Sequence, residues 1–211
     1  DGVTPALFTD FSYDNLGVPR NTTLEANNDN TTVSYIVALQ RADYDGVHRY
    51  YDLGVCGPLR SDIGKTYAEA GACGAFKVPT LRNIALTAPY FHNGIFGDLR
   101  TALSFYVTRD TNPGAWYPKS GNIVTKFDDL PEIYGGQYKV DLSNPSSDTK
   151  YVGNVNVTEV PYNRKLGDAP ALSPSEIDDV IAFLCTLNDG YDPANPAGYI
   201  QPQQCVDVQA P

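Results

Sequence analysis

The chain contains two histidines, His48 and His92, which are candidate ligands for a transition metal. Two histidines and a third ligand can bind a copper ion, but the sequence does not show whether the fold brings this pair together. The simpler interpretation of His48, which stands among polar residues, is a surface or hydrogen-bonded histidine. His92 precedes Asn93-Gly94, a pair typical of a β-turn.

Four cysteines form a second group of reactive side chains, and none of them stands in a C-x-x-C motif: Cys56, Cys73, Cys185 and Cys205. Four cysteines allow three pairings, and four free thiols in a cytosolic protein are the alternative. We favour the pairs Cys56–Cys73 and Cys185–Cys205. Each would close a loop of about 17–21 residues and stabilise the fold by about 3 kcal/mol. Two disulfides indicate an oxidising compartment, so we expect a periplasmic or secreted protein.

The longest stretch with a coherent pattern, residues 73–106, reads CGAFKVPTLRNIALTAPYFHNGIFGDLRTALSFY. It predicts an extended step before Pro79, a short turn, the β-turn after His92 and a helix over about 98–107. Apolar residues of that helix recur at i, i+3, i+4 and i+7, and Asp98 is a suitable N-cap. They are Leu99, Ala102, Leu103 and Tyr106.

A second helix is predicted after Ser173. Ser173 is the expected N-cap, Pro174 occupies the first helical position, and Glu176 completes an S-x-x-E capping box. One face of this helix is apolar, and residues 188–190 provide the stop. This is the most strongly signalled helix of the chain.

Composition limits the possible partners. The net charge of −10 disfavours nucleic acid, because an acidic chain repels phosphate backbones. No apolar run reaches about 18 residues, so no membrane span is expected. Glycine and proline total 34 residues (18 plus 16), which predicts a loop-rich chain. Because no basic and apolar leader precedes Asp1, we expect the mature form of a protein whose signal peptide has been removed.

Four blocks of the sequence, in order, resemble the bacterial di-haem cytochrome c peroxidase and MauG family. They lie at residues 7–20, 53–58, 73–106 and 162–191, and include FTDFSYDNLGVPR, DLGVCG and DAPALSPSEIDDVIAFLCTLNDGY. In the family, the cysteine of the second block pairs with that of the CGxFK motif, which supports Cys56–Cys73. Single motifs such as PTLRN are weak, whereas four ordered blocks are specific.

The resemblance implies a mainly α, cytochrome c-like fold with long loops and little β structure. Residues 1–191 would form the second-haem domain, with an irregular insertion at about 108–160, and residues 192–211 a coiled C-terminal tail. Family members carry two c-type haems and reduce hydrogen peroxide with electrons from a partner protein. They also hold a calcium ion between their two domains.

Specific residues follow from the same resemblance. The backbone carbonyls of Thr87 and Pro89 would bind the calcium, a hard cation that readily accepts oxygen ligands. Peroxidases of the family place a methionine on the distal side of the second haem, and MauG places a tyrosine there. This chain has no methionine, and the position falls on Tyr106. The simpler interpretation is that Tyr106 packs in the helix with its hydroxyl in water.

Three more residues are implied to lie near the haem. His92 is a rival ligand, although a hydrogen-bonded histidine beside the haem fits better. Arg82 and Lys77 would pair with the haem propionates, although ordinary surface ion pairs explain them equally well. No residue of this chain is expected to be catalytic by itself.

The family attaches its haem through CxxCH, a motif that this sequence lacks. We therefore expect the haem to be attached outside this chain, on a haem-bearing N-terminal chain or domain, with a redox protein as a further partner. A haem held by a different subunit and a haem-free relative are the alternatives. A haem-free protein could act as an extracellular copper-binding or surface protein. A non-catalytic electron-transfer subunit is a third possibility.

Overall fold

The computed structural model describes residues 6–27, 51–57, 71–149, 151, 153–191, 194 and 202–206. Three α helices lie in this part of the chain: α3 (Leu99–Thr108), α4 (Pro174–Cys185) and α5 (Gln203–Val206). Five short 3₁₀ helices accompany them: η1 (Glu25–Asn27), η2 (Ile84–Leu86), η3 (Pro113–Ala115), η4 (Glu132–Tyr134) and η5 (Pro145–Ser147). The described helices contain no segment that is both long enough and apolar enough to cross a membrane.

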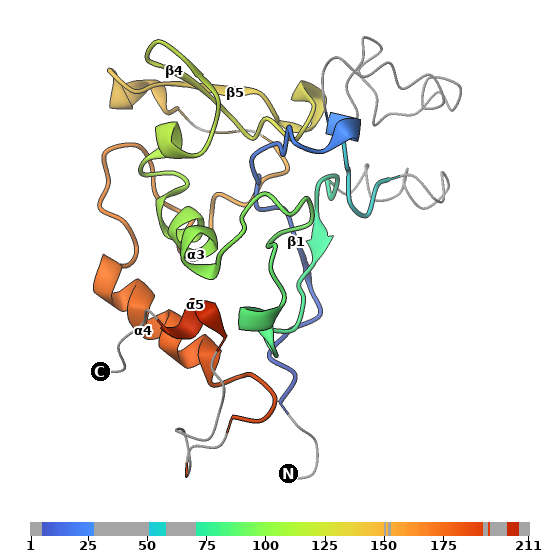
Figure 1. Cartoon of the computed structure of the whole chain (residues 1–211). Coiled ribbons are helices and arrows are strands. Elements are labelled where there is room, and N and C mark those ends of the chain that lie inside the picture. The colour runs from blue at the N-terminus through green and yellow to red at the C-terminus, as the bar shows by residue number, and fades with distance from the viewer. Residues whose placement is uncertain are drawn as a thin grey trace.

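The predicted mainly α fold is wrong for the described residues. Besides three short helices they form two small antiparallel sheets, and turns connect most of the rest (Figure 1). One sheet pairs β1 (Tyr13–Asp14) with β2 (Phe76–Lys77), and the other has the order β3 (Lys119–Ser120), β4 (Ile123–Lys126), β5 (Tyr138–Asp141). The glycine and proline content explains the short elements, because both residues interrupt helices.

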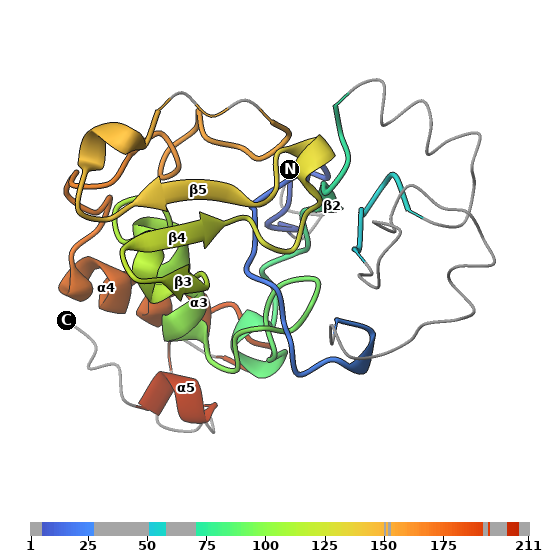
Figure 2. The same cartoon turned by 90° about the horizontal axis from the view of Figure 1, so that it is seen from above.

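The three-stranded sheet lies over α3, as the view from above shows (Figure 2). Strands β4 and β5 form a hairpin in which Val124 faces Val140, and both valines are fully buried. Their neighbours along each strand are more exposed, which is the alternation expected of a sheet with one face on the core. Gly135 and Gly136 lie in the connection between these two strands.

Helix α3 begins where the sequence predicts. The Asp98 carboxylate accepts a hydrogen bond from the Thr101 backbone N–H at 2.7 Å, which satisfies one of the free donors of the first turn. The Gln204 side chain, from the tail, accepts a second hydrogen bond from the Leu99 N–H at 2.6 Å. Gln204 also donates to the Ala85 carbonyl of η2 at 3.0 Å, so the tail fixes two elements of residues 73–106.

Helix α4 has the predicted capping box, with both the Ser173 and the Glu176 hydrogen bonds formed. It packs against α3 and η2, and Arg100 of α3 forms an ion pair with Asp178 of α4. Both favoured disulfides are confirmed. Cys56–Cys73 joins residues 53–58 to the start of residues 73–106, and Cys185–Cys205 joins α4 to α5.

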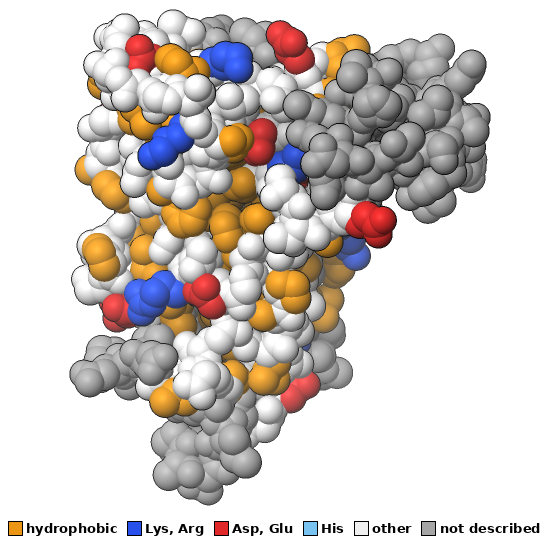
Figure 3. All heavy atoms as spheres, turned by 45° about the horizontal axis from the view of Figure 1, so that its top comes forward, with side chains coloured by type: hydrophobic (Ala, Val, Ile, Leu, Met, Phe, Trp, Pro, Cys, Tyr) orange, Lys and Arg blue, Asp and Glu red, His pale blue; other side chains and the backbone are white. Residues whose placement is uncertain are grey.

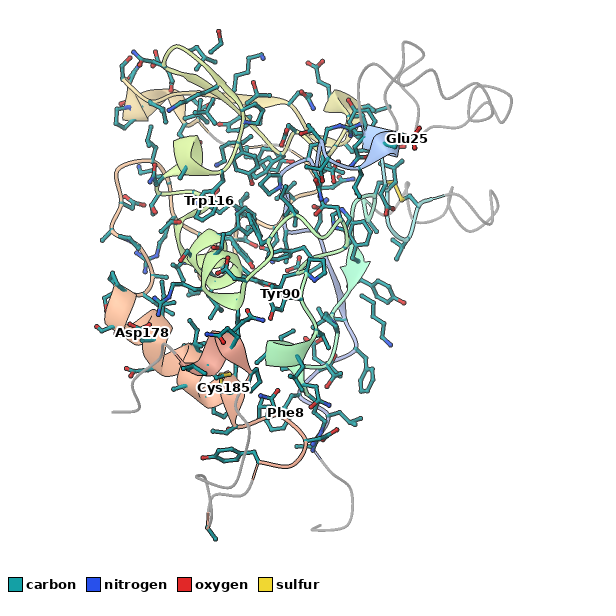
Figure 4. The ribbon with its side chains drawn as sticks, viewed as in Figure 1. Phe8, Glu25, Tyr90, Trp116, Asp178 and Cys185 are labelled. Atoms are coloured by element: carbon teal, nitrogen blue, oxygen red, sulfur yellow. A yellow bond between two sulfur atoms is a disulfide. The ribbon has the colours of Figure 1, made fainter. Side chains whose placement is uncertain are left out.

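Aromatic rings fill the space between α3, the three-stranded sheet and the loop before α4. Neighbouring ring centroids in this cluster lie 5.3–6.5 Å apart, within the range that aromatic pairs prefer. We call it the aromatic cluster: Phe91, Phe96, Phe105, Tyr106, Trp116, Tyr117, Phe127 and Tyr162. Figure 4 shows Trp116 between α3 and the sheet.

Candidate functional site

Tyr106 lies at the edge of the aromatic cluster, near the C-terminal end of α3. Its ring centroid is 5.3 Å from that of Phe91 and 5.9 Å from that of Tyr162, and its side chain is partly buried. Burial raises the pKa of the Tyr106 phenol to about 12, with a further increase from the Asp14 carboxylate and an opposing effect of a side-chain hydrogen bond with Tyr162. The free phenol is therefore protonated at neutral pH.

Tyr162 packs against the Tyr106 ring and is only 4% exposed. The guanidinium of Arg109 lies 4.2 Å from its ring centroid, close enough for a cation–π interaction. Burial raises the pKa of the Tyr162 phenol, and the charge of Arg109 acts in the opposite direction. Nothing in the sequence marks Tyr162 as a site residue, although it lies in one of the four family-like blocks.

Arg109 belongs to a buried cluster of three charged side chains, which we call the ion cluster: Arg109, Asp110 and Lys126. Asp110 accepts hydrogen bonds from Arg109 Nε at 2.8 Å and from Lys126 Nζ at 2.7 Å. The remaining Arg109 donors bind the carbonyls of Leu16 at 2.9 Å and Asn156 at 2.7 Å. Two cations and one carboxylate leave a net charge of +1 in the core beside Tyr162.

The sequence carried no signal for this cluster. Arg109 and Asp110 follow α3 at the start of the stretch without regular periodicity, and Lys126 lies 16 residues further on. Charged side chains are rarely fully buried unless they are paired. Nothing in the spacing of these three residues indicates that they meet.

His92 lies on the loop before α3, and its side chain is 14% exposed. Its ring stacks on Phe76 with centroids 3.7 Å apart, and Nε2 lies 3.3 Å from the Asp129 carboxylate. The same carboxylate accepts hydrogen bonds from Asn93 Nδ2 at 3.0 Å and Arg20 Nη1 at 3.2 Å. His92 is thus hydrogen-bonded, and its place beside a haem stays a prediction. Its role as a haem ligand stays a prediction, and so does a copper site with His48, which lies outside the described residues.

Arg82 and Lys77 lie near the N-terminal segment. Arg82 Nε donates to the Ala6 carbonyl at 2.7 Å, and its guanidinium lies 5.7 Å from the Phe8 ring centroid. Lys77 Nζ lies 5.5 Å from the Phe11 ring centroid. Within the described ranges neither cation has a carboxylate partner, so the ordinary ion pairs that could explain them are not formed there.

Apolar side chains of the N-terminal segment, of residues 81–86 and of α4 are exposed, and we call them the lower apolar patch: Leu7, Phe8, Leu81, Leu86 and Phe183. The rings of Phe8 and Phe183 meet edge to face with centroids 6.4 Å apart, which places the N-terminal segment beside α4. Figure 4 shows Phe8 at this end of the molecule, near Cys185. On another view, hydrophobic side chains also extend across the middle of the visible face (Figure 3).

Thr87 and Pro89 lie on an exposed turn between η2 and Tyr90. The Thr87 N–H and hydroxyl both bind the Ile84 carbonyl. The carbonyl oxygens of Thr87 and Pro89 accept no hydrogen bond from any part of the chain that the structure describes. They are therefore available to water or to a cation. No group of three histidine, cysteine or acidic side chains suited to a metal occurs among the described residues.

Comparisons with known proteins bear on these residues. The chain is 30% identical over 188 residues to the methylamine utilization protein MauG of Paracoccus denitrificans, matching 88% of this chain and 36% of MauG. It is 37% identical over 71 residues to the cytochrome-c peroxidase IdrP1 of a Pseudomonas strain, matching 30% of this chain and 19% of IdrP1. No family model matches the sequence.

Solved structures of a di-haem peroxidase are also similar to this chain. The di-haem peroxidase BthA of Burkholderia thailandensis matches 87% of this chain and 35% of its own, with a TM-score of 0.60 and 35% identity. A BthA variant with one tyrosine replaced by methionine matches 97% of this chain and 38% of its own, with a TM-score of 0.62 and 32% identity. The chain thus spans about a third of the length of MauG and BthA.

Proposed function

We propose that this chain, a homologue of a portion of the di-haem cytochrome c peroxidase and MauG family, forms the distal side of the second haem of such an enzyme. The complete protein would reduce hydrogen peroxide with electrons from a partner protein. Because the chain has no CxxCH motif, the haem would be attached to a haem-bearing N-terminal chain or domain. The two disulfides support a periplasmic or secreted location.

The observation that carries this proposal is the position of Tyr106. It lies at the edge of the aromatic cluster on a helix whose N-terminus is fixed by Asp98 and Gln204. A phenolate oxygen is an established haem ligand, and it requires a defined orientation. Because burial raises the pKa of the free phenol, only a bound metal would ionise it at neutral pH.

The residues around the N-terminal segment also fit a haem in their chemistry. The lower apolar patch offers exposed apolar side chains that a flat apolar macrocycle or an adjoining domain would cover. Arg82 and Lys77 would supply cations for the propionates, since neither is paired with a carboxylate in the described structure. A bound haem would supply one-electron chemistry, and this chain would orient it, shield it from water and set its ligand.

A calcium ion is the second component that we propose. The Thr87 and Pro89 carbonyls would contribute two of its ligands, and oxygen atoms from the adjoining domain and water would contribute the rest. Support comes from their exposure and from the absence of a competing donor in the described part of the chain. Such a shared ion would couple this chain to the haem-bearing part.

The test begins with an absorption spectrum and an intact-mass measurement on the native protein. A Soret band, together with a covalently haem-modified polypeptide that contains or accompanies this chain, is the expected result. Peroxide turnover should require the haem-bearing part, and removal of calcium by a chelator should reduce it. A haem-free protein that binds copper would contradict the proposal. A haem protein without turnover would indicate an electron-transfer subunit instead.

A further inference from the structure

The side chain of Gln204, in the tail, holds three points of the segment that leads into α3. Its Oε1 accepts a hydrogen bond from the Leu99 N–H at 2.6 Å. Its Nε2 donates to the Ala85 carbonyl and to the Tyr90 hydroxyl, both at 3.0 Å. Chemistry fixes this orientation of the amide, because a backbone N–H can only donate and a carbonyl can only accept. One side chain thus binds the start of α3 and both ends of the turn between η2 and Tyr90.

The three residues that Gln204 binds lie in the interior. Leu99 is 4% exposed, Ala85 2% and Tyr90 6%. The Tyr90 hydroxyl donates its proton to the Ile84 carbonyl at 2.8 Å, which leaves its oxygen to accept from Gln204. A buried donor or acceptor that loses its partner costs free energy. The three hydrogen bonds therefore favour one arrangement of the turn relative to α3.

Gln204 is itself held by the residue that follows it. Cys205 is 4% exposed and forms the disulfide with Cys185 at the end of α4. The Cys205 N–H also donates to the Pro202 carbonyl at 2.8 Å. Because Gln204 stands next to this covalent link, α4 sets its position.

The start of α3 and the candidate haem ligand belong to the same helix. Tyr106 follows Leu99 by seven residues, about two helical turns, so the two lie on one face. Between them, Ala102 and Phe105 are buried in the core. Closely packed interiors transmit strain, so a displacement of the first turn of α3 would also displace Tyr106.

We propose that Gln204 is a positioning residue for the second haem: it fixes the start of α3 against the preceding turn and thereby places the Tyr106 oxygen. The inference rests on the proposed function, because it takes Tyr106 as the ligand. Residues that orient a ligand can tune a metal centre without touching the metal. Gln204 acts in this way, through α3.

The experiment compares two variants of Gln204 in the complete haem-bearing protein. In Gln204→Met the side chain keeps its length and loses all three hydrogen bonds. In Gln204→Glu, at pH 7, an oxygen remains for the Leu99 N–H, but no donor remains for the Ala85 carbonyl or the Tyr90 hydroxyl. The second variant therefore keeps the contact with α3 and loses the contacts with the turn.

Gln137→Met is the matched control. Gln137 is also partly buried, and its amide donates to two backbone carbonyls, those of Asp128 at 3.0 Å and Leu130 at 3.1 Å. Its replacement removes a comparable number of hydrogen bonds at a place that does not contact the start of α3.

Two quantities are measured: the phenolate charge-transfer band of the ferric spectrum and the amide exchange rate at Leu99. In Gln204→Met the band should lose intensity, and Leu99 should exchange about 2–10-fold faster, which corresponds to one lost hydrogen bond. Gln204→Glu and Gln137→Met should keep both values. Rescue by glutamate separates positioning of α3 from a general loss of stability, because glutamate also lacks the contacts with the turn.

Tyr106→Phe separates this inference from the proposed function. If Tyr106→Phe abolishes the band and Gln204→Met leaves it unchanged, the inference is overturned and the ligand assignment stands. An equal loss of the band in Gln204→Met and Gln204→Glu, or in Gln137→Met, would also overturn it. If Tyr106→Phe leaves the spectrum unchanged, or no haem is bound, the proposed function fails and the inference with it.

The double variant Cys185→Ser, Cys205→Ser covers the case in which Gln204→Met does not fold. It frees the tail and leaves Gln204 in the chain. The phenolate band should weaken as exchange at Leu99 becomes faster. A band of unchanged intensity would overturn the inference.

Discussion

The guanidinium of Arg109 and the ring of Tyr162 lie 4.2 Å apart in the interior of the protein, and neither is exposed to more than a few per cent. This contact joins a cluster of buried charges to the aromatic side chains that surround Tyr106. It makes the charges a structural support for the candidate site, because each Arg109 donor that holds the guanidinium also fixes the plane against which Tyr162 packs.

Replacing Arg109 should therefore be costly. Arg109→Met leaves the Leu16 and Asn156 carbonyls without their donors and removes one of the two cations bound to Asp110. The Asp110–Lys126 pair stays in place, but each buried carbonyl left without a donor costs about 1–3 kcal/mol, or about 2–6 kcal/mol for the two. We expect a loss of this size in the free energy of unfolding, measured in urea.

Arg100→Met is the matched control for that experiment. Arg100 also pairs with an aspartate, Asp178, but both side chains are well exposed. Exposed ion pairs contribute less than about 1 kcal/mol. Similar losses for the two variants would contradict a structural role of the ion cluster.

Removal of the Cys185–Cys205 disulfide should loosen the tail. The pair closes a loop of 20 residues, which corresponds to about 3 kcal/mol in the chain-entropy description. In the double variant Cys185→Ser, Cys205→Ser, we expect this loss of stability and faster amide exchange at Leu99, whose N–H binds Gln204. Unchanged exchange at Leu99 would show that the tail does not fix the start of α3.

Asp128 should make stability decrease as the pH rises. Burial raises its pKa to about 6, opposed by a hydrogen bond from the Arg20 N–H and assisted by the Asp129 charge. A raised pKa means that the folded state binds the proton more tightly than the unfolded state does. The stabilisation is complete below about pH 4 and is lost as the pH rises through 6.

Asp128→Asn should remove this pH dependence, because an amide does not titrate in this range. The amide oxygen can still accept the hydrogen bond from the Arg20 N–H, which lies 3.1 Å from the carboxylate. We expect the variant to be more stable at pH 7 by about 1–2 kcal/mol and unchanged at pH 3.5. Urea unfolding from pH 3.5 to 7 measures both values. The exposed control Asp141→Asn should retain the decline between pH 4 and 6, and an identical decline in Asp128→Asn would refute the assignment.

Features set by neighbouring residues could be predicted from the sequence. The N-caps at Asp98 and Ser173 and the extents of α3 and α4 followed from side chains within a few positions of each other. The disulfides followed from cysteine number and loop length, with support from a family motif. The four sequence blocks also led to the correct relatives.

Features set by distant residues could not be predicted. The pairing of β4 with β5 buries Val124 and Val140. The expectation of a mainly α fold did not include this sheet. Arg109 bonds to Leu16 and Asn156, which are 93 and 47 residues away, and no periodic pattern connects them. The contact of Tyr106 with Tyr162 depends on that same long-range arrangement.

The absorption spectrum of Tyr106→Phe in the complete haem-bearing protein shows whether Tyr106 is a ligand of the second haem. Phenylalanine keeps the contacts of the ring with Phe91 and Tyr162 and removes only the oxygen. If Tyr106 binds the iron, the variant loses the phenolate charge-transfer band, and one of the two haems has a higher reduction potential. A spectrum and potential identical to those of the unmodified protein would contradict this assignment.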